Sequence, residues 1–157
     1  MFSEITKANL YLKIFGITKI PLLFFCRPKI IRLDSQLVEI KIPLRRRTKN
    51  HLNSMYFGAL SVGADITGGF LAMTCIQKSK RNVALIFKDF KADFLKRAEG
   101  DVHFTCNQGK DILSLVDKTI QSGNRENMTV YIDALVPSIS QDLVAKFELT
   151  LSLKERK

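Results

Sequence analysis

One acidic residue stands alone in a long apolar segment and is the first candidate for chemistry. Asp65 is the only charged residue between Met55 and Ile76. If this segment is a helix, at about 100° per residue a set of small residues lies within about 60° of Asp65 on one face. These residues are Gly58, Ser61, Gly68, Gly69 and Ala72. Glycine in a helix interior is about 1 kcal/mol less favourable than alanine, so something must come close to this backbone.

Two interpretations of this face remain open. The small residues pack closely against a sheet or another helix, with Asp65 hydrogen-bonded to the backbone. Alternatively, they line a narrow substrate channel in which Asp65 is the one reactive group. In the second case, desolvation would raise the pKa of Asp65 and make it a usable base near neutral pH.

The start of the same helix is the second candidate. Unpaired N–H groups around residues 55–58, together with the helix macrodipole, favour an oxyanion or a carbonyl oxygen. Phe57 precedes Asp65 by eight residues, which is about 12 Å along a helix axis. One substrate carbonyl cannot touch both groups on the same helix. If they cooperate, they come from two copies of the chain, which predicts a homodimer with shared sites.

The positive charge is concentrated before this helix. The 157 residues carry a net charge of +10, and residues 1–53 hold 11 basic against 3 acidic residues, a net charge of +8. The densest run is Arg45-Arg46-Arg47-Thr48-Lys49, and Lys96 with Arg97 is a second basic patch. Such a run is most often a solvated surface, and otherwise binds phosphate or nucleic acid. No aromatic residue lies within 45–51 for stacking on bases, so we expect no nucleic-acid partner.

Several other kinds of site are excluded. Two histidines and three cysteines lack the spacing of metal ligands, and no G-x-S-x-G, P-loop or Rossmann glycine pattern occurs. We expect no metal and no cofactor. An odd number of cysteines without C-x-x-C fits reduced thiols, which predicts a cytoplasmic protein. For Met55–Ile76 as a membrane span, Asp65 would cost about 2.5–3.5 kcal/mol against about 0.3–0.6 kcal/mol gained per strongly apolar residue. We therefore expect a buried helix and no stable membrane insertion.

The elements that must position these residues follow from periodicity. Lys29–Leu33 and Leu37–Pro43 alternate around Asp34–Gln36 and predict a β-hairpin. A long helix is expected over about 54–79, with Ser54 or Asn53 as its N-cap. Further strand-like segments and one short amphipathic helix follow. The strand-like segments are 82–91, 92–95, 101–106, 128–136 and 143–153, and the short helix is 110–122.

The architecture follows from covering the apolar faces of these strands. Only the 54–79 helix is apolar enough all round to lie under the whole sheet. The fold class is therefore α+β, an antiparallel β-sheet wrapped around a long central helix (about 54–79). We expect a single domain over 1–157 with an N-terminal helical extension at about 1–26, of which roughly 3–16 is helical before a break at Pro21.

Two segments resemble a known family. Residues 50–65, Asn-His-Leu-Asn-Ser-Met-Tyr-Phe-Gly-Ala-Leu-Ser-Val-Gly-Ala-Asp, resemble the signature of hotdog-fold acyl-CoA thioesterases of the phenylacetate-pathway (PaaI-like) type. There an Asn-containing loop leads to His-Gly-Gly and then to an Ala-Asp pair. Residues 94–101, Phe-Leu-Lys-Arg-Ala-Glu-Gly-Asp, resemble that family's Phe-Leu-(Arg/Lys)-Pro-x-x-Gly-Asp. The N-terminal helix and the 110–122 insert are similar to a poorly characterised branch of the superfamily.

The resemblance implies roles for individual residues. Asp65 matches the general base or nucleophile, and Asn50 matches the loop asparagine that helps position water or substrate. Phe57 matches the first glycine, whose N–H polarises the thioester carbonyl, and Gly58 matches the second. Tyr56 replaces the histidine of the motif, and Ala98 its usual proline.

The resemblance also implies a substrate and a partner. We expect hydrolysis of acyl-CoA or related acyl-carrier thioesters at a dimer interface, in a homodimer or a tetramer. Arg45, Arg46, Arg47 and Lys49, with Lys96 and Arg97, would bind the phosphates of coenzyme A, which enters as part of the substrate. The alternative is a non-catalytic acyl-CoA or fatty-acid binding protein on the same fold, which the aromatic residues Tyr56 and Phe57 favour. A hotdog dehydratase is disfavoured because its His-Phe-Pro-type loop is missing.

Overall fold

The computed structural model describes residues 3–156, so residues 1, 2 and 157 of the predicted domain lie outside the described part. The helices are α1 (Glu4–Thr18), α2 (Pro21–Cys26), α3 (Phe57–Ser79) and α4 (Gly109–Ser122). The strands are β1 (Lys29–Leu33), β2 (Val38–Ile42), β3 (Val83–Phe94), β4 (Val102–Cys106), β5 (Glu126–Leu135) and β6 (Leu143–Glu155). The predicted hairpin, central helix and short helix are all present.

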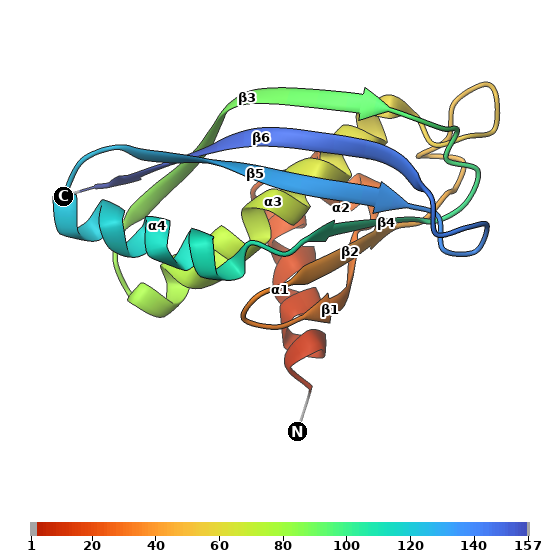
Figure 1. Ribbon diagram of the computed structural model, residues 1–157. Coiled ribbons are helices and arrows are strands. Elements are labelled where there is room, and N and C mark those ends of the chain that lie inside the picture. The colour runs from red at the N-terminus through yellow and green to blue at the C-terminus, as the bar shows by residue number, and fades with distance from the viewer. Residues whose placement is uncertain (1–2, 157) are drawn as a thin grey trace.

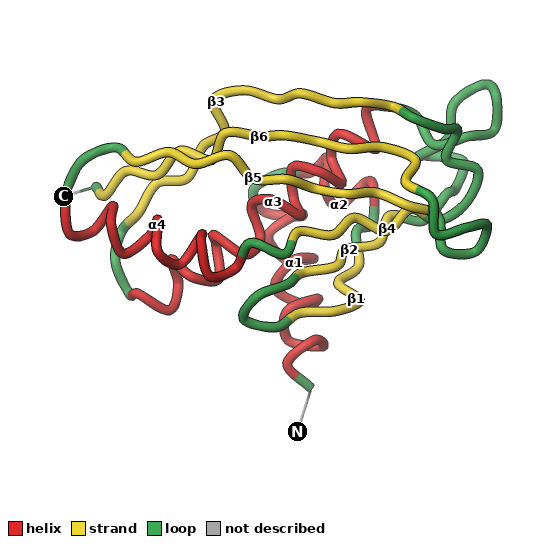
Figure 2. The backbone as a smooth tube through the Cα atoms, in the orientation of Figure 1, coloured by secondary structure: helices red, strands yellow, loops and turns green. Residues whose placement is uncertain are grey.

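The strands form one antiparallel sheet in the order β1-β2-β4-β5-β6-β3. This sheet curves over α3, which runs beneath it (Figure 1), while α4 packs at one end against α3, β5 and β6. Along the chain the strands come in consecutive pairs separated by α3 and α4, and Figure 2 distinguishes the strands from the helices by colour. The predicted architecture, an α+β fold with a sheet wrapped around a central helix, is confirmed.

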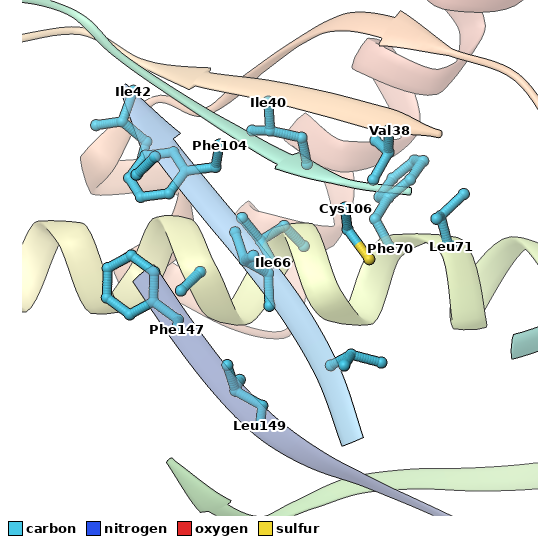
Figure 3. Close-up of a cluster of buried hydrophobic side chains, with 14 of the residues drawn as sticks. Val38, Ile40, Ile42, Ile66, Phe70, Leu71, Phe104, Cys106, Phe147 and Leu149 are labelled. Atoms are coloured by element: carbon cyan, nitrogen blue, oxygen red, sulfur yellow. The ribbon is translucent and has the colours of Figure 1, made fainter. Parts of the chain in front are cut away.

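The core lies between the sheet and α3. Alternate side chains of β2, β4 and β6 point toward the helix, where Ile66, Phe70 and Leu71 meet them (Figure 3). Burying each large apolar side chain contributes roughly 1.5–3 kcal/mol, so the period-two pattern of the strands accounts for this arrangement. α3 is also the one helix among the described residues that is long and apolar enough to cross a membrane, but 61% of its most apolar stretch is buried. It is packed as a core helix.

The predicted N-cap of the central helix, Ser54 or Asn53, is wrong by two or three residues. The N-cap of α3 is Tyr56, and the helix begins at Phe57 instead of at about 54. The backbone N–H of Ser54 donates to Asn50 Oδ1 (3.2 Å), and that of Met55 donates to the carbonyl of Ala98 (2.8 Å). These bonds hold the two residues in the preceding loop, which delays the helix.

The two strand-like segments predicted at 82–91 and 92–95 form a single strand, β3. Its register with β6 shifts between Phe87 and Phe90. Within this bulge, Asp89 Oδ1 accepts a hydrogen bond from the backbone N–H of Thr150 (2.9 Å). A side chain thus replaces a backbone partner, and the strand continues past the irregularity instead of ending there.

The N-terminal segment folds back onto the domain. The amide of Asn9 in α1 pairs with the backbone of Ile30 in β1, donating to its carbonyl (2.9 Å) and accepting from its N–H (2.8 Å). Tyr11 packs edge-on against Phe70 of α3, with ring centroids 6.4 Å apart. The residues after the helix break form α2, with Pro21 in its first turn. α1 therefore covers the β1 edge of the sheet and contacts the central helix.

Candidate active site

Asp65 lies on α3 beside a cavity of about 370 Å³. The other walls come from α1 with the loop after it, α2, and the start of β3. Apart from Asp65, Gln77 and Tyr11, every lining residue is apolar or glycine. The lining consists of Tyr11, Phe15, Ile20, Leu23, Asp65, Ile66, Gly69, Met73, Ile76, Gln77, Val83, Leu85 and Phe87. The site is thus an apolar pocket with a single carboxylate in its wall. Pockets that bind small molecules are commonly of this kind, mostly apolar with a few polar groups.

Burial raises the pKa of Asp65 above its ordinary value. Within residues 3–156, no hydrogen bond or ion pair to its carboxylate offsets this desolvation, which is the one cause of the shift. The backbone hydrogen bond proposed in the packing interpretation is therefore not found there. A partly buried carboxylate with no cation beside it is not a structural ion-pair partner.

The small-residue face of α3 serves two purposes. Gly69 lines the cavity with Asp65, and a Cβ there would lie 3.6 Å from Phe87, an ordinary contact. Gly68 faces the sheet instead, where a Cβ would lie 3.2 Å from both Val130 and Ile132. The sheet therefore covers one side of this face, at Gly68, and the cavity opens on the other, at Gly69.

The start of α3 is open to solvent. No side chain caps it, since Tyr56 makes no capping hydrogen bond. Phe57 is 59% exposed, and its ring lies 4.8 Å from that of Tyr56 and 6.3 Å from that of Phe94. A Cβ added to Gly58 would overlap the Tyr56 ring. The free backbone donors of the first turn therefore lie beneath an exposed aromatic cluster.

Asn50 organises the loop before α3. Its Oδ1 accepts from the backbone N–H of Leu52 (2.9 Å) and of Ser54 (3.2 Å), and its Nδ2 donates to Ser54 Oγ (3.1 Å). The side chain thus fixes the turn that leads into the helix. In this conformation it acts on the helix start through the backbone rather than by pointing a free amide at it.

The predicted basic residues separate into groups. Arg45, Arg46 and Arg47 line one open depression of about 680 Å³, together with Arg27, which no sequence pattern had indicated. Lys49 pairs through its backbone with Met55, and Lys96 Nζ lies 2.7 Å from Asp142 Oδ2. Arg97 is exposed in the loop after β3. Only the first three of the predicted cations share a depression.

Two residues of the pocket could not be selected from the sequence. Tyr11 and Phe15 come from α1, where they read as part of an N-terminal extension. Nothing in their spacing says which other element they contact. Among the described residues no three His, Cys, Asp or Glu side chains gather into a metal-binding group.

Solved structures share this fold. A candidate thioesterase from Shewanella oneidensis matches with a TM-score of 0.80 at 13% identity, over 95% of this chain and 99% of its own. A protein of unknown function from Chlorobaculum tepidum gives 0.83 at 12% identity, over 97% of each chain. A thioesterase from Haemophilus influenzae gives 0.71 at 15% identity, over 99% and 93%. The fold is the hotdog fold.

The family follows from the sequence match. The chain belongs to the family described as a domain of unknown function (DUF4442), which matches residues 10–153. The match begins within α1, so the family includes most of this helix as well as the wrapped sheet. No curated protein matches the chain.

Proposed function

We propose that the protein hydrolyses acyl-CoA or related acyl-carrier thioesters, with Asp65 as general base or nucleophile. The observation that carries the proposal is the position of Asp65, an unpaired carboxylate with a raised pKa at the wall of an otherwise apolar cavity. Such a cavity suits an acyl chain, and the carboxylate suits either activation of water or direct attack on a thioester carbonyl.

The second half of the proposed site is the start of α3. The N–H groups of Phe57 and Gly58 would polarise the thioester carbonyl, and Asn50 would hold the loop that presents them. Phe57 lies eight residues before Asp65, or about 12 Å along the axis. We therefore assign the two halves of each site to different subunits of a homodimer, or of a tetramer made of such dimers. This arrangement matches the PaaI-like type that residues 50–65 resemble.

The coenzyme A portion would meet the basic residues around the site entrance. Arg45, Arg46 and Arg47 lie in the loop that leads to α3, and their depression offers cations for phosphates. Lys49 and Arg97 are exposed on neighbouring loops and would extend this positive field. Lys96 would join them by exchanging its ion pair with Asp142 for a phosphate. We place the protein in the cytoplasm, because its three cysteines are all free thiols.

The test is hydrolysis of a panel of acyl-CoAs by the wild type and by Asp65→Asn, with released thiol as the readout. Removing a general base lowers the rate about 10²–10⁴-fold, so we expect at least a hundredfold loss in kcat/KM. Asp117→Asn, on the exposed side of α4, is the matched control and should keep full activity. No turnover on any chain length, or full activity in Asp65→Asn, would contradict hydrolysis by this residue.

A non-catalytic acyl-CoA or fatty-acid binding protein is the second candidate. Its support is the pair Tyr56 and Phe57, whose rings lie 4.8 Å apart over the helix start and narrow the approach to its N–H groups. Binding of an acyl-CoA without turnover, measured by calorimetry, would favour this function over hydrolysis.

A further inference from the structure

A stripe of apolar side chains on α1 faces away from the domain. Leu10, Ile14 and Ile17 are 50–59% exposed, and their spacing places them within about 60° of one another around the helix axis. The other side of α1 is occupied, since Leu12 is buried and Tyr11 lines the Asp65 cavity. One face of α1 therefore packs against the domain, and the opposite face is exposed to solvent.

The stripe adjoins a groove with cations on its rim. Lys13 lies three residues after Leu10 and four before Ile17, so it is a neighbour of both on the helix surface. It also lines a groove of about 760 Å³ between α1, α2 and the start of β1, together with Arg27 and Lys29. No carboxylate of the described residues lines this groove. The exposed apolar side chains of α1 thus lie next to the cations that line the groove.

A second depression extends the positive charge. Arg27 lines both the groove and the neighbouring depression of about 680 Å³, where Arg45, Arg46 and Arg47 join it. The exposed ring of Phe25 lies in this depression with the Arg47 guanidinium 5.0 Å above it. We call the α1 stripe, the groove and this depression together the N-terminal face.

The charge of this face decides what can cover it. Its groove and its depression are lined by no carboxylate of the described residues and by six cations, of which Arg45 also lies 3.7 Å from Asp101. The six cations are Lys13, Arg27, Lys29, Arg45, Arg46 and Arg47. A second copy docked face to face would bring the same cations together, which is unfavourable. A surface of anionic lipids offers the complement: lysines and arginines attract it by about 1 kcal/mol each near the headgroups, while apolar side chains enter the acyl boundary.

From this combination we propose that the N-terminal face docks the protein on membranes that contain anionic phospholipids. The binding is peripheral, with α1 lying in the interface and α3 remaining in the core. In this orientation α1 lies between the lipid and the Asp65 cavity, because Tyr11 and Phe15 of α1 line that cavity. The proposal does not depend on thioester hydrolysis, since lipid binding needs no reaction.

The test is co-sedimentation of the full chain with vesicles of phosphatidylcholine alone and of phosphatidylcholine mixed with phosphatidylserine. We expect binding to the mixed vesicles, weakened by added salt, and at least about tenfold weaker binding to phosphatidylcholine alone. The triple variant Leu10→Ser/Ile14→Ser/Ile17→Ser should lose about tenfold or more in binding to mixed vesicles. Lys13→Glu, which alters the charge and leaves the stripe, should also weaken that binding.

Matched controls remove apolar or basic residues elsewhere. Leu113→Ser on α4 and Ile139→Ser in the loop after β5 are 47% and 61% exposed in the wild type, and Lys110→Glu changes an exposed lysine of α4. These variants should bind like the wild type, and circular dichroism should show that all variants are folded. Absence of vesicle binding, or equal binding to both vesicle types, would overturn the proposal. So would a triple variant that keeps its lipid binding or changes only the oligomeric state.

Discussion

At the scale of single residues, the burial that would make Asp65 a usable base also lowers the stability of the folded protein at neutral pH. Burial raises the pKa of its carboxyl group above the ordinary value of 3.8, so the folded state holds the proton more tightly than the unfolded chain. As pH rises through the interval between the two pKa values, the folded state must ionise a desolvated group and loses stability. We therefore expect Asp65→Asn to raise the free energy of unfolding at neutral pH, while it lowers kcat/KM at least a hundredfold.

The pH dependence makes this prediction specific. In urea denaturation over a series of pH values, the advantage of Asp65→Asn should shrink as pH falls towards 3.8 and the wild-type carboxyl becomes protonated. Asp117→Asn on the exposed side of α4 should stay within about 0.5 kcal/mol of the wild type. A less stable Asp65→Asn at neutral pH would show that the carboxylate has a stabilising partner in the folded protein.

At the scale of elements, the glycines of α3 differ in whether the surrounding packing leaves room for a side chain. A Cβ at Gly63 would overlap the buried ring of Phe104, whereas a Cβ at Gly69 would lie 3.6 Å from Phe87. We expect Gly63→Ala to lose about 1–3 kcal/mol by overpacking. Gly69→Ala should be neutral or gain up to about 1 kcal/mol from helix propensity. Chemical denaturation compares the two variants, and equal losses would contradict the assignment of Gly63 to the sheet side.

The same helix shows how far sequence reasoning reaches. Its length, its apolar character and its place under the sheet follow from composition and periodicity. Its start does not, because Asn50 and the Ala98 carbonyl hold Ser54 and Met55 in the loop through contacts that no local pattern records. Helical projection places Gly68 and Gly69 together near Asp65, but only the packed structure separates the residue against the sheet from the one in the cavity.

The candidate site was predictable only where its residues stand out in the local sequence. Asp65 stands out because a charge in an apolar helix is conspicuous, and Arg45–Arg47 stand out as a run. Tyr11 and Phe15 complete the cavity from another element, and a contact between α1 and α3 leaves no trace in the spacing of either. Arg27 joins the arginine depression in the same way, across the fold.

At the scale of the whole molecule, the two edges of the sheet are unequal. Asn9 binds the backbone of Ile30 and so covers the β1 edge. The opposite edge is β3, which pairs only with β6 among the described residues and exposes Ile86 and Phe90. A long uncovered edge strand with apolar side chains is a template for pairing with another chain. We therefore assign the proposed dimer contact to β3.

This assignment predicts that a variant unable to pair through β3 loses both the dimer and the thioesterase activity. Ile86→Lys/Phe90→Lys places like charges on both copies of the edge. We expect light scattering to show a dimer for the wild type and a monomer for this variant. Acyl-CoA turnover should fall with it, because one chain alone cannot bring Asp65 and the Phe57 N–H to the same carbonyl. Leu113→Lys, 47% exposed on α4 in the wild type, should leave both unchanged. A monomeric edge variant with full turnover would show instead that each chain contains a complete site.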